Sequence, residues 1–145
     1  MGVEVEVVRH ASEEVTKALG RLLPQLSRSA PPLDSEGLAR LVSWNGNTLL
    51  AARLDGEIVG ILTLVMFPIP TGLRAWIEDV VVDESARGHG VGADLTREAV
   101  RLARAAGART VDLTSRPSRE AANRLYERLG FRQRDSRLYR LAEQE

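Results

Sequence analysis

The spacing of hydrophobic and polar positions changes along the chain from that of a strand to that of a helix and back. Residues 3–8, VEVEVV, begin with the alternation of a half-buried strand. Apolar residues then recur every three or four positions over residues 15–26, which predicts an amphipathic helix capped by Ser12. After the two prolines of SRSAPPLDS, a shorter helix capped by Asp34 or Ser35 is predicted.

Three strand-like runs make up the middle of the chain. The runs TLLAARL and EIVGILTLVMF are joined by Asp55-Gly56, a dipeptide typical of tight hairpins, so they are predicted to be antiparallel neighbours. The stretch PIPTGLR is predicted to be a loop. Residues 75–82, AWIEDVVV, end in valines on both faces, which predicts a strand in the centre of a sheet.

The last third of the chain alternates helices with strands. A helix is predicted over residues 90–106 with Gly107 as its stop, and RTVDLTS follows as a strand. Strand, helix and strand in this order predict a crossover between parallel neighbours. A last helix should open at Pro117 and Ser118 and close at Gly130, and FRQRDSRLYRL should end the chain as one or two strands. This order predicts a mixed α+β fold.

Composition narrows the class of protein. A chain of 145 residues with 43% hydrophobic content suits a single domain over residues 1–145. Twenty basic and twenty acidic residues give no net charge, which argues against nucleic-acid and membrane partners and favours a small molecule. There is no cysteine and there are only two histidines, so no metal is expected. No leader pattern opens the chain and no run of about 18 apolar residues occurs, so we expect a cytoplasmic protein.

Three glycines at alternating positions precede the helix predicted from residue 90, in the stretch DESARGHGVGADL. Glycines let a ligand approach the main chain, and the N–H groups at the start of a helix bind anions. A tight connection explains such glycines equally well. Two nucleotide motifs can be excluded. Ala93 and Asp94 stand where a P-loop has lysine and a hydroxyl residue, and Gly92 follows Gly90 too closely for a dinucleotide fingerprint.

Two motifs resemble those of the GCN5-related N-acetyltransferases (GNAT). RGHGVG, residues 87–92, fits the signature Arg/Gln-x-x-Gly-x-Gly/Ala, and AANRLYERLGF, residues 121–131, resembles the family's helix that carries a tyrosine and ends in Gly-Phe. The resemblance implies a mixed, mostly antiparallel central sheet with a splayed parallel pair and about four flanking helices. It also implies acetyl transfer from acetyl-coenzyme A, the co-substrate, to an amine. Dimers are common in the family, although no feature of this sequence requires one.

The resemblance also implies which residues hold the co-substrate. The main chain of the central strand would pair with the pantetheine arm through Val80, Val81 and Val82. The pyrophosphate would be bound by main-chain N–H groups of Gly88, His89, Gly90, Val91, Gly92 and Ala93. Arg87 either adds charge there or is a solvated loop residue. Asn123 is a candidate contact, but many relatives place their asparagine seven residues before the tyrosine, where this chain has Arg119.

Acetyl transfer needs a neutral amine and a proton for the departing thiolate. Tyr126 matches the family's tyrosine, which gives its proton to the sulfur; the alternative is a core aromatic beside Leu125 and Leu129. An amine with a pKa of about 10.4 is charged at neutral pH, so a base is useful. Glu78 is the candidate, through a water, with Asp79 or water itself as alternatives. Strand alternation puts the two acids on opposite faces unless a bulge intervenes.

The acceptor stays open at this level. The strand WIEDVVV resembles that of glucosamine-6-phosphate N-acetyltransferases, but a peptide, a sugar and an antibiotic all remain compatible with the sequence. Trp76 either lines the acceptor site or belongs to the core. The alternative function is a module that binds acetyl-coenzyme A, as a sensor for example, and catalyses nothing.

Overall fold

A five-stranded sheet with the order β1-β2-β3-β4-β5 organises the first of two units in the computed structural model, which describes residues 2–142. The strands are β1 (Val3–Val8), β2 (Asn47–Leu54), β3 (Glu57–Ile69), β4 (Gly72–Val82) and β5 (Thr110–Leu113). Only β4 and β5 are parallel; the other neighbours are antiparallel. The mixed α+β fold with a parallel pair is therefore confirmed.

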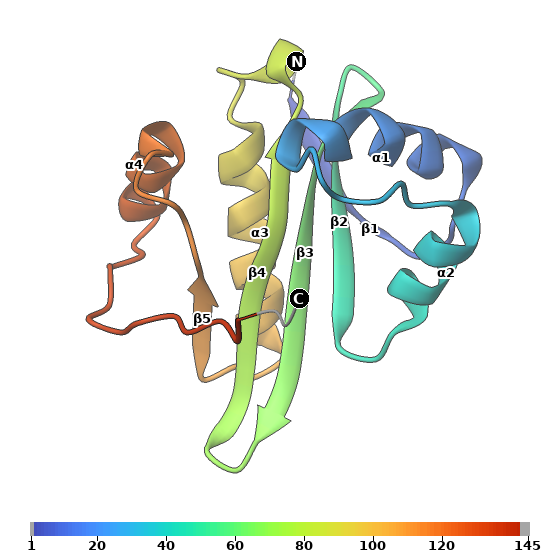
Figure 1. Ribbon diagram of the computed structural model, residues 1–145. Helices are drawn as coiled ribbons and strands as arrows, with labels where there is room; N and C mark the ends of the chain where they lie inside the picture. The colour runs from blue at the N-terminus through green and yellow to red at the C-terminus, as the bar shows by residue number, and fades with distance from the viewer. Residues whose placement is uncertain (1, 143–145) are drawn as a thin grey trace. The chain divides into compact units, whose positions relative to one another are not determined.

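Helices cover both faces of this sheet (Figure 1). The helices of the first unit are α1 (Glu13–Leu26), α2 (Ser35–Ser43) and α3 (Val91–Ala105), with a short 3-10 turn, η1 (Glu84–Ala86). The predicted caps form: Ser12 Oγ accepts from Val15 N and Asp34 Oδ1 from Gly37 N. None of the helices in residues 2–142 is long and apolar enough to cross a membrane.

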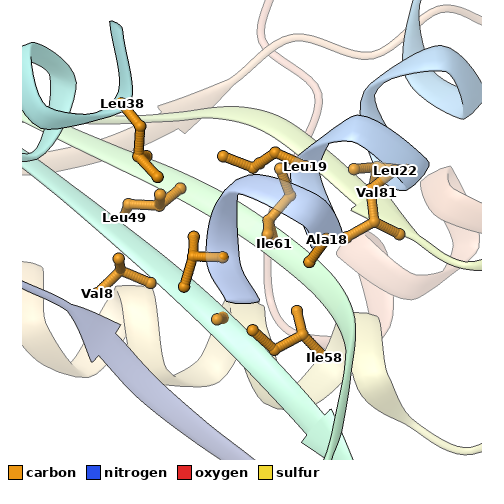
Figure 2. Packing of buried hydrophobic residues seen from close by; sticks show 11 residues of the cluster. Val8, Ala18, Leu19, Leu22, Leu38, Leu49, Ile58, Ile61 and Val81 are labelled. Carbon is orange, nitrogen blue, oxygen red and sulfur yellow. The ribbon is translucent and has the colours of Figure 1, made fainter. Parts of the chain in front are cut away.

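One hydrophobic core lies between the sheet and the pair α1 and α2. Leu19 and Leu22 of α1 and Leu38 of α2 are buried against Leu49 and Ile61 of the sheet (Figure 2). These helix residues belong to the apolar positions predicted from the sequence. Residues directly opposite one another on paired strands share a face. The residues that lie opposite Leu49 on the neighbouring strands therefore face α1 and α2 as well.

Two hairpins join the central strands, and only the hairpin between β2 and β3 was predicted from the sequence. Asp55 and Gly56 both have positive φ, 53° and 85°, and close the β2–β3 hairpin as expected. The loop predicted for PIPTGLR is wrong, because β3 and β4 continue to Ile69 and Gly72. Pro68 is tolerated in β3 because the pairing of β3 with β2 ends at Val65. The missing N–H of Pro68 therefore costs no hydrogen bond to β2.

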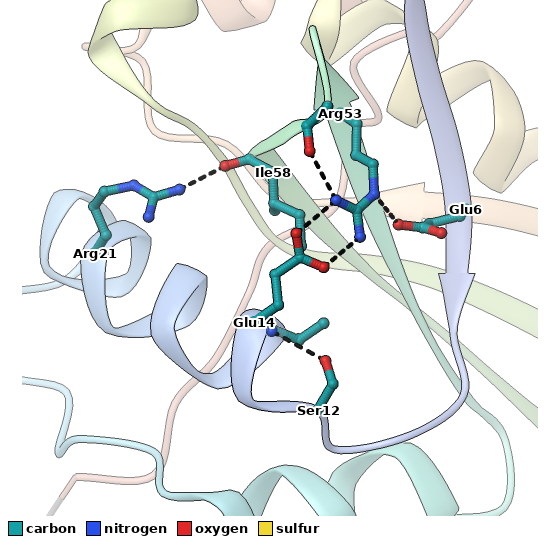
Figure 3. A network of polar contacts seen from close by, with 8 residues as sticks. Glu6, Ser12, Glu14, Arg21, Arg53 and Ile58 are labelled. Carbon is teal, nitrogen blue, oxygen red and sulfur yellow. Dashed lines mark hydrogen bonds and ion pairs between the residues drawn. The ribbon is translucent and has the colours of Figure 1, made fainter.

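Arg53, near the end of β2, joins β1, α1 and the β2–β3 turn (Figure 3). Its guanidinium donates to both carboxylate oxygens of Glu14 on α1 at 2.7 Å and to Glu6 on β1 at 2.5 Å. It also donates to the carbonyl of Gly56 at 2.9 Å. The hydrogen bonds from Arg53 lower the pKa of Glu14 below its ordinary value of 4.5, with burial as a weaker opposing effect.

We expect Arg53→Met to lower the melting temperature by about 2–5 °C at pH 7, since a network of partly exposed charges contributes modestly. A carboxylate whose pKa is lowered in the folded state stabilises the fold at pH values above its ordinary pKa. This contribution is lost as the pH falls through the lowered pKa. The difference between variant and wild type should therefore shrink below about pH 4.5. Thermal unfolding at several pH values measures this, with exposed Arg9→Met as the control. A difference independent of pH would contradict it.

The second unit begins at Ser115 and contains α4 (Glu120–Arg128). This helix starts later than the predicted Pro117 and Ser118, which form a turn instead, and the backbone of Gly130, with φ 102°, closes it as predicted. The strand predicted for FRQRDSRLYRL is wrong: residues 131–142 form no strand. A strand needs a paired neighbour, and within the described residues no other strand pairs with this charged segment.

Candidate functional site

Among residues 2–142, strand β4 has a hydrogen-bonding partner on its β5 side along only part of its length. Residues Arg74 to Ile77 pair with Thr110 to Leu113, and then β5 ends while β4 continues to Val82 (Figure 1). Backbone groups of the unpaired half on this side are available to an extended ligand that adds to the sheet as a strand would. The parallel pairing of β4 and β5 that the family resemblance implied is therefore present, and it stops after Ile77 and Leu113.

A bulge interrupts β4 at the start of this unpaired half. Glu78 is opposite Thr63 and Val81 is opposite Ile61, so Asp79 and Val80 together face one residue of β3. Asp79 has a φ of 49°, a left-handed conformation that aspartate tolerates better than most residues. The simple alternation of faces along AWIEDVVV is therefore wrong beyond Glu78. The bulge resets it, so that Glu78 and Val81 share the face of α1 and α2.

The glycine-rich turn leads from β4 into α3 with its main chain exposed. Gly88 and Gly90 have φ of 86° and 77°, and Gly90 is the N-cap of α3 with no side chain capping the helix. The N–H groups of Gly88, His89 and Gly90 donate to no backbone acceptor within residues 2–142. Together with the free N–H groups of the first turn of α3, they form a cluster of donors at the positive end of a helix.

Close packing fixes where this helix begins. A Cβ on Gly60 of β3 would lie 2.9 Å from Val91 Cγ1 and 3.1 Å from Leu95 Cδ1, so only glycine lets α3 approach β3 this closely. Gly60 is opposite Val82, the last residue of β4. The unpaired edge of β4 and the free N–H groups of α3 are thereby held next to each other.

The connection between them is also held in place by α1. Arg21 Nη2 donates to the carbonyl of Ile58 at 2.6 Å, and Arg21 Nε lies 3.3 Å from Asp83 Oδ2. Gln25 Oε1 accepts from Glu84 N at 3.0 Å. The hydrogen bond from the backbone N–H of Ser85 is the main reason that the pKa of Asp83 lies below its ordinary value. The turn therefore starts from a constrained position.

The cofactor-binding residues predicted in the first unit run along the chain from the end of β4 through the turn to the start of α3. Val81 and Val91 are buried and anchor it, whereas Val80, Val82, Gly92 and Ala93 are half-buried. Arg87, Gly88, His89 and Gly90 are exposed. His89 Nδ1 lies 3.0 Å from the carbonyl of Ala86, which leaves its other ring nitrogen free of that bond.

Glu78 lies at the junction of the paired and unpaired halves of β4. Although its side chain is reached by solvent, burial raises the pKa of its carboxyl above 4.5, and the charge of Asp79 adds to this. The neighbouring Trp76 is half-buried on the same face. A carboxylate with a raised pKa is a better proton acceptor than an ordinary one.

Tyr126 and Asn123 belong to the second unit, on α4. Burial raises the pKa of Tyr126, with the charge of Arg119 acting in the opposite direction, so the phenol stays protonated at neutral pH. Its ring packs edge-on against Phe131, with ring centres 5.9 Å apart. Asn123 Nδ2 donates to the carbonyl of Arg116 at 3.0 Å, which gives this amide a structural role at the start of the helix.

Sequence reasoning missed three polar residues on the face shared by Trp76 and Glu78. Arg74 is directly opposite Thr110, and Trp76 is directly opposite Asp112. The alternation of RTVDLTS does place Thr110 and Asp112 on one face, but the register with β4 was needed to bring Arg74 beside them. Within residues 2–142, three or more acidic or histidine side chains are nowhere grouped as metal ligands.

Comparison with known proteins relates this arrangement to one family. The model of the acetyltransferase (GNAT) family matches residues 17–131. A glucosamine 6-phosphate N-acetyltransferase of Trypanosoma brucei brucei is 37% identical over 111 residues, which cover 71% of this chain and 74% of the relative. An aminoalkylphosphonate N-acetyltransferase of Salmonella typhimurium strain LT2 is 32% identical over 134 residues, covering 87% and 84%. The crystal structure of a Trypanosoma brucei acetyltransferase superposes with a TM-score of 0.79 at 29% identity, covering 97% of this chain and 99% of that one.

Proposed function

Because the chain belongs to the acetyltransferase (GNAT) family, we propose that it transfers the acetyl group of acetyl-coenzyme A to a primary amine. The observation that carries this is the unpaired half of β4 leading directly into the free N–H groups of α3. A ligand with an extended amide-bearing arm and a pyrophosphate matches these two features in the same order. We propose that both units form one acetyltransferase domain, since the family match spans residues from each.

Acetyl-coenzyme A is proposed to bind along the end of β4 and the glycine-rich turn that follows it. The pantetheine arm pairs with the main chain of Val80 to Val82, and the pyrophosphate receives N–H groups of residues 88–93. Arg87 and His89 are exposed at the turn and add donors for the phosphates. Asn123 is a weaker candidate, because its Nδ2 already donates within its own unit and only its carbonyl oxygen stays available.

The proton transfers are assigned to two side chains. The amine nitrogen attacks the acetyl carbon, the carbon–sulfur bond breaks, and the phenol of Tyr126 gives its proton to the departing sulfur. Glu78 accepts a proton from the amine through a water. The raised pKa of Glu78 supports its role as the base, since it favours proton uptake. The role of Tyr126 rests on its match to the tyrosine of the family.

We expect Glu78→Gln to lower kcat/KM about tenfold or more at pH 7, because the glutamine accepts no proton. In the wild type the base must be ionised, so activity should fall as pH drops through the raised pKa of Glu78. This fall in activity, the acidic limb of the pH–rate profile, should lie above pH 4.5 in the wild type and be absent in the variant. Initial rates of thiol release against pH measure it. Asp79→Asn tests the alternative base, since asparagine also tolerates the bulge conformation; loss of the limb in that variant alone would move the role to Asp79.

The acceptor is proposed to be a small amine that carries a phosphate or phosphonate group. The two relatives above are named for glucosamine 6-phosphate and aminoalkylphosphonate, which both combine an amine with such a group. A peptide amine is the alternative acceptor. Cytoplasmic location and a homodimer remain predictions.

One experiment tests the function directly. Titration calorimetry with acetyl-coenzyme A should show binding, and a panel of amines with phosphate, sugar, peptide and aminoglycoside groups should release free thiol. Absence of binding at millimolar co-substrate would overturn the proposal. Tight binding without thiol release from any amine would favour the non-catalytic binding module.

A further inference from the structure

We propose that Arg74 and Thr110 form the subsite that binds the anionic end of the acceptor, a phosphate or phosphonate group, while the amine lies toward Glu78 and Asp112. This inference rests on the proposed function and adds to it which residues of this chain select the acceptor. Arg74 acts here as a binding residue and has no part in the proton transfers.

The register of the sheet places these side chains on one face. Glu78 is opposite Thr63, which is opposite Leu49 in the core beneath α1 and α2. Arg74 and Trp76 lie four and two residues before Glu78, so they share its face. The parallel pairs Arg74–Thr110 and Trp76–Asp112 extend this face onto β5.

Two buried polar atoms on this face have no partner within the described residues. They are Nε of Arg74 and Oγ1 of Thr110, which belong to directly paired residues of β4 and β5. Buried polar atoms are almost always hydrogen-bonded, so two unpaired atoms on paired residues indicate a position where a ligand binds. The Nε–H of arginine can only donate, and a hydroxyl can donate as well, so an acceptor such as an oxyanion satisfies both.

Arginine suits this ligand for a second reason. A planar guanidinium makes paired hydrogen bonds to phosphate-type oxygens, which an ammonium does not. No carboxylate among residues 2–142 lies within ion-pair distance of Arg74, in contrast to Arg53 and Arg101. Its charge is therefore available to a ligand.

The charges along the face are separated in the way that such an acceptor requires. Glu78 lies at the start of the unpaired half of β4, Trp76 and Asp112 are opposite one another in the middle of the face, and Arg74 and Thr110 are opposite one another toward the start of the strand. At a rise of about 3.3 Å per residue, the Cα atoms of Arg74 and Glu78 are roughly 13 Å apart, a gap that both long side chains shorten. This spacing fits a small amine with an anion at its other end.

The test compares acceptors with and without the anion. Steady-state kinetics should use 2-aminoethylphosphonate, O-phosphoethanolamine and ethanolamine, the last of which has no anionic group. Arg74→Gln should raise KM for the first two about tenfold or more and leave ethanolamine within about twofold, since a charge-assisted hydrogen bond is lost. Arg74→Lys should recover part of the loss. Arg104→Gln, which removes an exposed charge on α3, is the control.

Binding without turnover separates this inference from the proposed function. Calorimetry with 2-aminoethylphosphonate on protein saturated with coenzyme A should show binding that Arg74→Gln weakens by a similar factor. Binding that depends on Arg74 without thiol release would overturn the acetyl transfer and keep the subsite. No binding to the wild type, or an equal effect of Arg74→Gln on all three amines, would overturn the subsite.

Discussion

Replacing Gly90 with glutamate should weaken acetyl-coenzyme A binding about a hundredfold, because a carboxylate would stand among the N–H groups that we assign to the pyrophosphate. The turn itself can accommodate the side chain, since a Cβ on Gly90 has no heavy atom within 4 Å. The cost to folding is limited to the left-handed backbone, φ 77°, which disfavours any residue but glycine. Titration calorimetry with acetyl-coenzyme A measures the loss of affinity, and thermal unfolding measures the cost to stability.

The opposite end of the same helix offers a matched control. Gly107 has a φ of 86° and equally open surroundings, so Gly107→Glu introduces the same charge and similar backbone strain away from the turn. We expect this control to lose stability and to keep its affinity. Equal affinities in the two variants would show that the glycine-rich turn of α3 does not hold the co-substrate.

Tyr126→Phe should lower kcat at least tenfold, because phenylalanine keeps the aromatic packing and removes the proton for the departing sulfur. Affinity for acetyl-coenzyme A should stay near that of the wild type, since the ring still packs against Phe131. Thiol release at saturating co-substrate measures kcat, and calorimetry measures affinity.

The chain contains a second tyrosine that serves as the comparison. Tyr139 is 84% exposed and has no assigned role, so Tyr139→Phe should leave kcat and affinity unchanged. Unchanged turnover in Tyr126→Phe would remove this phenol from the chemistry. An equal loss in both variants would mean that the effect is not specific to α4.

Local patterns predicted most of the first unit because each element there is decided by nearby residues. The periodicity of α1, its Ser12 cap and the Asp55-Gly56 turn are short-range signals, and all three are confirmed. The glycine-rich turn was recognisable for the same reason, since Gly88 and Gly90 occupy backbone conformations that favour glycine.

Features that depend on pairing between distant residues were beyond such reasoning. The bulge at Asp79 is visible only from the register of β4 against β3, and it decides that Glu78 and Val81 share a face. Arg74 and Thr110 are separated by a helix in the sequence and meet only because β4 and β5 are parallel neighbours. The strand prediction at the C-terminal end failed likewise, because a strand also needs a partner strand, which the local sequence does not specify.

The early end of β5 sets a limit on how this protein can be made more stable. A designer who extended β5 alongside Val80 to Val82 would gain regular ladder hydrogen bonds and a longer sheet edge. The same bonds would consume the backbone groups that we assign to the substrate, so the more regular sheet would be the inactive one. Stability gained at this position would be gained at the expense of function.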